Sequence, residues 1–279
     1  MIIRVLVTGA AGFLGKKVVE KLLDRGSLRG ADGREHAIAQ IVTTDRVDHS
    51  WDASSIPVAH VPGDISEPSH TGKLFDRPVD SVFHMAAALA LESEAHFEQG
   101  MAINLGGTMA LLDLCRRQAR PATFIFPSSL AVFGGTLPDT VGDHVPQTPQ
   151  TSYGTHKSII ELLINDYSRH GFIDGRGLRL PIVLLRAGAP SPAISDRVAA
   201  VARDPLHGRD IVCPFNRDTV IPVASGDTVA RSLLDLHDLD AAGLGGQRFM
   251  NLPSLSVTFG DIEAAVGRKA GALSLGHVT

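Results

Sequence analysis

The sequence has little cysteine: Cys115 and Cys213 are the only two in 279 residues. They lie far apart and form no CxxC pair, so the sequence indicates neither a disulfide framework nor a zinc site. The twelve histidines show no metal-ligand spacing such as HExxH, and we expect no metal. Such sparse cysteine is typical of a reducing compartment, which predicts a cytoplasmic protein.

The sequence also lacks an excess of one charge and long apolar runs. Its 26 basic and 30 acidic residues give a net charge of -4, and no five like charges follow one another. Nucleic acid and anionic membranes are therefore not expected as partners. No stretch reaches the ~18 apolar residues of a membrane span, and the apolar N-terminus lacks a basic leader, so neither anchoring nor export is expected.

What the sequence does contain is an alternation of short apolar runs with helical patterns. The predicted strands are residues 2–7, 37–43, 58–61, 81–85, 123–126 and 177–186. The predicted helices are residues 13–24, 102–117 and 153–170. This order predicts an α/β fold with a parallel sheet covered on both faces. The less regular segment after residue 187 predicts a division into 1–187 and a smaller lobe, 188–279, interleaved with the end of the sheet.

A glycine-rich turn separates the first strand from the first helix. Gly9, Gly12 and Gly15 form a GxxGxxG sequence there. Such a turn lets the backbone approach a pyrophosphate, which binds the free N–H groups of the helix N-terminus. The alternative, a purely structural loop, stays open on this motif alone.

An acidic residue closes the second strand. Asp45 follows Gly15 by 30 residues, and we assign the extra length to a surface insertion through residues 29–34. A carboxylate here accepts hydrogen bonds from an adenine ribose and repels a 2′-phosphate, which favours NAD over NADP. Arg46 partly offsets this preference, and a solvated strand end is the alternative for Asp45. Asp64 and Ile65, after the third strand, are further candidates for adenine contacts.

A tyrosine and a lysine lie four residues apart on one face of a predicted helix. These are Tyr153 and Lys157. The strand before this helix ends in Ser128 and Ser129, at the sheet edge where ligands bind in this architecture. A serine and a tyrosine there can bind one substrate oxygen, and a lysine cation and an oxidised nicotinamide would lower the pKa of the tyrosine. The alternative is a lysine packed over a half-buried tyrosine.

Two other chemistries find less support. No GxSxG motif surrounds Ser128 or Ser129, which argues against a serine hydrolase. His84 and His156 are expected to be packed or surface residues rather than metal ligands.

The assembled motifs resemble the extended short-chain dehydrogenases/reductases, in the NAD-dependent epimerase/dehydratase branch. The matching segments are VTGAAGFLG (7–15), VFHMAA (82–87), FPSSLAVFG (126–134), SYGTHK (152–157) and LRLPIVLLRAG (178–188). The resemblance implies a Rossmann-type doubly wound sheet with a small C-terminal substrate lobe. It implies a catalytic trio of Ser129, Tyr153 and Lys157. It also implies an NAD site that includes Gly9, Gly12, Phe13, Leu14, Gly15, Asp45, Asp64, Ile65, Ala86, Ala87, Asn104, Tyr153, Lys157 and Pro181.

A narrower resemblance covers the segment from Ser152 to Asp196, which is similar to the D-erythronate dehydrogenases. It implies NAD-dependent oxidation of the 2-hydroxyl of a four-carbon sugar acid. Candidate substrate residues are Ser129, Arg186, which follows a predicted strand, and Arg217, in a segment where the family often contacts substrate. A surface ion pair is the alternative for each arginine. A nucleotide-sugar 4-epimerase that retains its NAD and a non-catalytic dinucleotide sensor are the alternatives. Relatives usually continue past Thr279, so a shortened lobe is expected, and a homodimer is one possible assembly.

Overall fold

The fold is described from a computed structural model, over residues 2–52, 54–184, 194–213, 215–270 and 276–278. The chain divides into two compact units. The first combines Met1–Arg179 with Ala230–Asn251, and the second combines Leu180–Val229 with Leu252–Thr279. The sequence predicted that residues 1–187 bind the cofactor and that residues 188–279 mainly bind the substrate. That assignment stays a prediction.

The first unit is built on a mostly parallel sheet. Within the described residues its order is β10-β7-β6-β5-β1-β3-β2, with β4 beside β3. Parallel pairing joins β1 to both β3 and β5, and β5 to β6. The predicted Rossmann-type α/β fold is confirmed. The strands are β1 (Ile3–Thr8), β2 (Ser27–Arg29), β3 (Glu35–Thr44), β4 (Val58–His60), β5 (Ser81–His84), β6 (Ala122–Ser129), β7 (Ile173–Leu180) and β10 (Phe249–Asn251).

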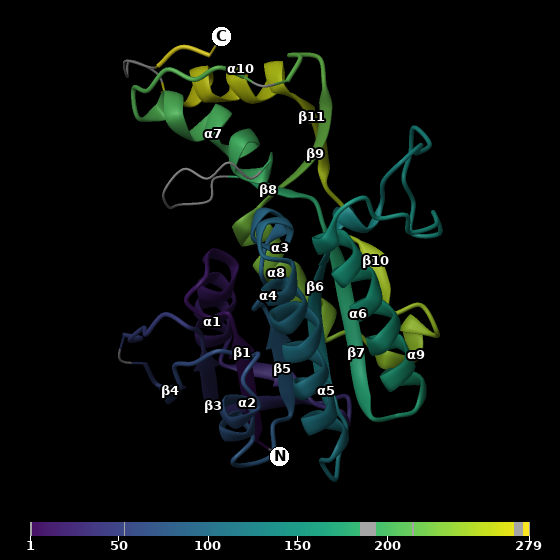
Figure 1. Cartoon of the computed structure of the whole chain (residues 1–279). Helices are drawn as coiled ribbons and strands as arrows, with labels where there is room; N and C mark the ends of the chain where they lie inside the picture. Colours follow the sequence, from purple (N-terminus) through teal and green to yellow (C-terminus); the bar gives the residue numbers. More distant parts are fainter. Residues whose placement is uncertain (1, 53, 185–193, 214, 271–275, 279) are drawn as a thin grey trace. The chain divides into compact units, whose positions relative to one another are not determined.

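Helices cover this sheet, and α2, α5 and α6 pack side by side along it (Figure 1). In α1, the buried face of Gly15, Val18, Val19 and Leu22 follows the predicted apolar repeat. Gly26, at φ +72°, ends α1 by donating its N–H to Leu22. The helices are α1 (Phe13–Arg25), α2 (Pro68–Leu74), α3 (Ala90–Ala95), α4 (Phe97–Met101), a π-helical segment (Ala102–Gly107), α5 (Thr108–Arg116), a 3₁₀ turn (Leu130–Val132), α6 (Ser152–Arg169) and α9 (Ala241–Leu244).

Two segments differ from the sequence-based expectation. The predicted insertion at residues 29–34 is the tip of a hairpin, because β2 pairs antiparallel with the start of β3. The strand predicted at 177–186 begins earlier, at Ile173, and is interrupted at Pro181. Proline has no N–H to donate to a ladder, so β7 ends at Leu180 and a separate strand, β8 (Ile182–Leu184), follows.

The second unit has its own small core. Three strands are ordered β11-β9-β8, with β11 antiparallel and β8 parallel to β9. Two helices pack against each other and bury Val198, Val201, Phe259 and Ile262. The elements are α7 (Ile194–Leu206), β9 (Val220–Ser225), β11 (Leu255–Thr258) and α10 (Phe259–Ala270), and α8 (Gly226–His237) starts in this unit and ends in the first. None of the helices in the described parts of the chain is long and apolar enough to cross a membrane.

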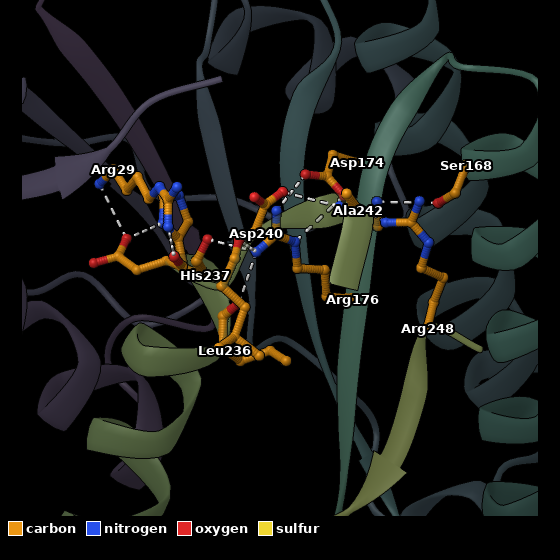
Figure 2. A network of polar contacts seen from close by, with 12 residues as sticks. Arg29, Ser168, Asp174, Arg176, Leu236, His237, Asp240, Ala242 and Arg248 are labelled. Carbon is orange, nitrogen blue, oxygen red and sulfur yellow. Dashed lines mark hydrogen bonds and ion pairs between the residues drawn. The ribbon is translucent and has the colours of Figure 1, made fainter. Parts of the chain in front are cut away.

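A buried arginine on β7 holds the C-terminal end of α8. The guanidinium of Arg176 donates to the carbonyls of Leu236, His237 and Leu239 at 2.6–2.9 Å and pairs with Asp174 (Figure 2). These carbonyls lack partners within a helix, so a cation at this end satisfies them and the helix dipole together. The network therefore holds the C-terminal end of α8 against β7 of the sheet.

Removal of this guanidinium is expected to destabilise the protein strongly. In Arg176→Ala, the carbonyls at and just after the end of α8 lose a buried donor, and Asp174 keeps only its pair with Arg248, which together cost about 3 kcal/mol of unfolding free energy. Urea unfolding monitored by circular dichroism measures the change. Arg169→Ala is the control, because Arg169 makes an exposed pair with Asp166 and should alter the midpoint little. Equal midpoints for the two variants would contradict this role of Arg176.

Candidate functional site

The glycine turn brings β1, α1 and the loop after β5 into close contact. Gly9 has φ +63°, and a Cβ there would stand 2.5 Å from the backbone nitrogen of Ala86. A Cβ on Gly15 would collide with the carbonyl oxygen of Gly9. Gly12 is the N-cap of α1 and has no side-chain cap, while Phe13 and Leu14 form the first turn, partly exposed. The turn therefore leaves helix N–H groups for an anion such as a pyrophosphate.

Asp45 lies beside this turn, directly after β3. One carboxylate oxygen accepts from the N–H of Ala11 at 3.1 Å and the other from that of Val47 at 3.1 Å. The side chain is half-buried, and a carboxylate has capacity for further donors such as ribose hydroxyls. Arg46 is exposed and pairs with Glu92 at 3.5 Å. Asp45 thus links the end of β3 to the glycine turn, which a freely solvated strand-end residue would not do.

Two of the remaining predicted residues belong to an apolar cluster. Ile65 and Ala86 pack together with Ala88 and Ile103. Asp64 uses its carboxylate to accept from the backbone and hydroxyl of Ser66, at 2.8 and 2.7 Å, so its role here is to shape the turn that presents Ile65.

Asn104, in the π-helical segment, fixes the loop that follows β5. Its amide exchanges two hydrogen bonds with the backbone of Ala88, at 2.8 and 3.0 Å, and lies 3.1 Å from Nδ1 of His156. Ala86 and Ala87 immediately precede the residue that Asn104 holds, and both keep part of their surface accessible. Asn104 therefore positions the wall of the site rather than facing it.

Ser129 ends β6, and Tyr153 and Lys157 lie on the first turns of α6. Thr151 caps α6 with its hydroxyl, and a Cβ on Gly154 would collide with the carbonyl of Ala131, so the helix packs tightly on the turn after Ser129. The side chain of Ser129 is close enough to the phenol of Tyr153 to act on its pKa. The Nζ of Lys157 lies 5.5 Å from the centre of the Tyr153 ring. The three predicted residues are thus brought together at the carboxyl end of β6.

The two titratable groups respond to burial in opposite directions. Burial raises the pKa of Tyr153 to about 12, and the side chain of Ser129 offsets this only in part. Tyr153 keeps some exposed surface, yet desolvation dominates at its phenol. Burial lowers the pKa of Lys157 to about 7, while the charge of Glu161 acts against it. In the protein alone, the expected lowering of the tyrosine pKa is therefore not achieved, because desolvation of the phenol has the larger effect.

Two predicted residues lie in the second unit, and a third lies outside the described residues. Pro181 follows β7 and is buried in the second unit. Arg217 is also in the second unit, where its exposed side chain pairs with Glu263 at 2.5 Å. Arg186 lies outside the described residues.

The structure adds residues that the sequence reading missed. Glu161 is fully buried on α6 and accepts from Ser128 and from Arg179 on β7. The only signal in the sequence was its position in the predicted helix, four residues after Lys157. His84 and His156 are packed as expected: His84 lies between the hydroxyls of Thr8 and Thr108, at 2.7 and 2.8 Å.

Comparison with known proteins agrees with this geometry. Residues 5–241 match the NAD dependent epimerase/dehydratase family. The chain belongs to this family. It is 40% identical to a D-erythronate dehydrogenase of Cupriavidus necator and 34% identical to one of Haemophilus influenzae, over 99% of this chain and 84–85% of theirs. A solved nucleoside-diphosphate-sugar epimerase from Agrobacterium tumefaciens has a TM-score of 0.90 at 33% identity, over 100% of this chain and 82% of that one.

Family membership confirms the predicted enzyme class, an NAD-dependent dehydrogenase of the short-chain dehydrogenase/reductase type that acts on a CH–OH group. A nicotinamide dinucleotide is therefore the cofactor class. The residues present fit such a group, because the N-cap of α1, Gly12, is exposed and the N-terminus of this helix has no side-chain cap. Gly9 and Gly15 let the turn pack tightly against its own backbone and that of Ala86. Asp45 flanks the same turn, and Ile65 packs against Ala86.

Replacement of Asp45 by serine tests its predicted contact with the ribose. We expect NAD to bind about 10- to 100-fold more weakly and discrimination against NADP to relax, because one charge-assisted acceptor and its negative charge are lost. Titration of both dinucleotides by isothermal calorimetry measures this. Asp48→Ser changes an exposed carboxylate three residues away and is the control. An unchanged ratio of the two affinities would leave Asp45 with only its role in the turn.

Proposed function

We propose that the chain oxidises the 2-hydroxyl of a four-carbon sugar acid, D-erythronate or a close aldonate, with NAD rather than NADP. The observation that carries this proposal is the meeting of Ser129, Tyr153 and Lys157 at one end of β6. The names of two curated relatives, both D-erythronate dehydrogenases, supply the substrate class. The preference for NAD rests on the carboxylate of Asp45 beside the glycine turn.

The chemistry assigned to each side chain follows from its position. Tyr153 takes the proton of the substrate hydroxyl, and Ser129 donates a hydrogen bond to the same oxygen. Lys157 favours the phenolate by its positive charge, which has to offset the effect of burial on Tyr153. A bound NAD would supply the acceptor for the hydride from C2 and a second positive charge beside that of Lys157.

A nucleotide-sugar 4-epimerase is the second candidate function. It is favoured by the likeness to the solved nucleoside-diphosphate-sugar epimerase, which covers the whole chain. An epimerase retains its reduced cofactor between two half-reactions, whereas a dehydrogenase releases it. A non-catalytic dinucleotide sensor has no need for a serine, a tyrosine and a lysine together, so we place it last.

Two further expectations stay predictions. The cytoplasmic location rests on the sparse cysteine. The homodimer gains some support from exposed apolar side chains on neighbouring helices of the first unit: Phe97 on α4, Met109 on α5 and Leu162 on α6 are 58%, 52% and 69% exposed.

A substrate panel decides between the two functions. Purified protein with NAD is given D-erythronate, other aldonates and nucleotide sugars, and absorbance in the band of reduced nicotinamide is followed. Steady release of NADH with an aldonate supports the proposal. Interconversion of a nucleotide sugar without NADH release would replace it by the epimerase.

Tyr153→Phe is expected to abolish most of the turnover. The change removes the proton acceptor and keeps the ring, so kcat should fall by at least the ~10²–10⁴ that general base catalysis contributes, with NAD affinity nearly unchanged. Steady-state kinetics and dinucleotide titration measure the two quantities. Tyr167→Phe is the matched control, because Tyr167 lies on the same helix and packs against Phe172. Retained activity in Tyr153→Phe would refute the mechanism.

The carboxylate of the substrate requires a cation or backbone donors, because a desolvated anion without partners is costly. We expect at least one of Arg186→Ala and Arg217→Ala to raise KM for the acid by about tenfold or more. Kinetics at saturating NAD measure this. The exposed ion pair of Arg217 with Glu263 shows that this side chain already has one partner. Two unchanged Michaelis constants would direct the search to backbone donors near Ser129.

A further inference from the structure

Lys157 is a buried cation whose nearest partners carry no full negative charge. Its side chain is almost inaccessible, and Nζ donates to the carbonyl of Pro127 at 2.8 Å. The same nitrogen lies 4.1 Å from the centre of the Phe126 ring. A carbonyl and aromatic faces stabilise an ammonium only in part. If the lysine is to act as a cation, a further charge has to hold its proton.

Glu161 is the carboxylate in position to do so. It lies one helical turn after Lys157, which places both side chains on one face of α6. Both reach the end of β6: Lys157 bonds to Pro127, and Glu161 accepts from the hydroxyl of Ser128 at 2.5 Å. The two side chains therefore contact adjacent residues, and the next residue of the strand is Ser129.

The carboxylate of Glu161 is held in place from three elements. Arg179 on β7 binds it through Nε and NH2, at 2.8–3.2 Å, and Gln147 donates to it at 2.5 Å. Arg179 also donates to the carbonyl of Asp143 at 3.2 Å. The carboxylate is 2% exposed, and these charge-assisted hydrogen bonds hold it in one position. It is therefore a fixed part of the site.

Few other charges act on the lysine. Tyr153 precedes it by one turn on α6 and is neutral at ordinary pH, because burial raises its pKa to about 12. His84 on β5 is also neutral, because burial, and secondarily Lys157 itself, lowers its pKa to about 3. Arg179 on β7 is positive and partly offsets the charge of Glu161. Glu161 is thus the negative charge that opposes the loss of the lysine proton.

We propose that the buried Glu161 carboxylate opposes the loss of the proton from Lys157 and is a positioning residue for the Ser129, Tyr153 and Lys157 site. The role of Glu161 in catalysis rests on the proposed function. Its effect on the charge of Lys157 concerns the protein without substrate or cofactor. Through Ser128, the same carboxylate also fixes the end of the strand that carries Ser129.

The charge on Lys157 is measured directly, without substrate or cofactor. The chain has six lysines, so lysine labelled with ¹³C at Cε gives few resonances, and Lys157→Arg identifies the one that belongs to Lys157. Its chemical shift, followed with pH, gives the pKa. Glu161→Gln should lower that pKa by about one unit or more, a tenfold loss of proton affinity. Asp166→Asn, an exposed carboxylate on the same helix, should leave it unchanged.

A double variant keeps the test valid if Glu161→Gln alone does not fold. Glu161→Gln leaves Arg179 buried and unpaired, whereas Glu161→Gln combined with Arg179→Gln removes both charges and leaves neutral groups that can bond. The pKa of Lys157 should fall in this double variant too. Glu161→Asp keeps the charge one methylene further away and should give a smaller fall. A Lys157 pKa that stays at its original value in the folded variants would overturn the proposal.

Kinetics then test the catalytic half separately. With the aldonate, Glu161→Gln should lower kcat about tenfold and change KM much less, because the loss falls on the proton-transfer step. A lowered lysine pKa with an unchanged kcat would overturn the positioning role. A lowered pKa in a protein that releases no NADH with any aldonate would instead refute the proposed function and leave the electrostatic role of Glu161 supported.

Discussion

The burial of one ammonium group is the constraint on which the candidate site depends. Lys157 needs a carbonyl, aromatic faces and a countercharge, and the end of β6 together with α6 provides all three. Helix and strand therefore have to approach closely. Gly154, between the tyrosine and the lysine, makes this possible, because a side chain there would collide with the carbonyl of Ala131. The glycine belongs to the site for a steric reason, although it carries no chemistry.

Much of the first unit could be predicted because its elements leave local signals. The apolar run of β1, the i+4 repeat of α1 and the glycines between them are visible within 25 residues. The approach of Ser129 to Tyr153 was also predictable, since parallel strands place their carboxyl ends at one edge of the sheet. In each case a short segment or a general rule of topology was sufficient.

The parts that escaped prediction depend on distant segments. β10 joins the sheet beside β7 from more than 70 residues further along the chain, and no local pattern marks such a partner. The buried acceptor Glu161 draws its donors from β6, the loop before α6 and β7. A glutamate within a helical repeat normally indicates the solvated face, so its burial becomes evident only when Arg179 is placed beside it. The break at Pro181 was misread because apolar residues flank it on both sides.

The strand β7 shows how the two faces of the sheet are coupled. It carries two buried arginines three residues apart, and an odd spacing along a strand places side chains on opposite faces. Arg176 binds the end of α8, while Arg179 binds Glu161 on α6. Burial of two guanidinium groups in one strand is costly unless each is fully paired, so both helices have to be in place at once. Formation of the first unit thereby fixes α6 against the sheet, and the position of α6 determines where Tyr153 and Lys157 meet the end of β6.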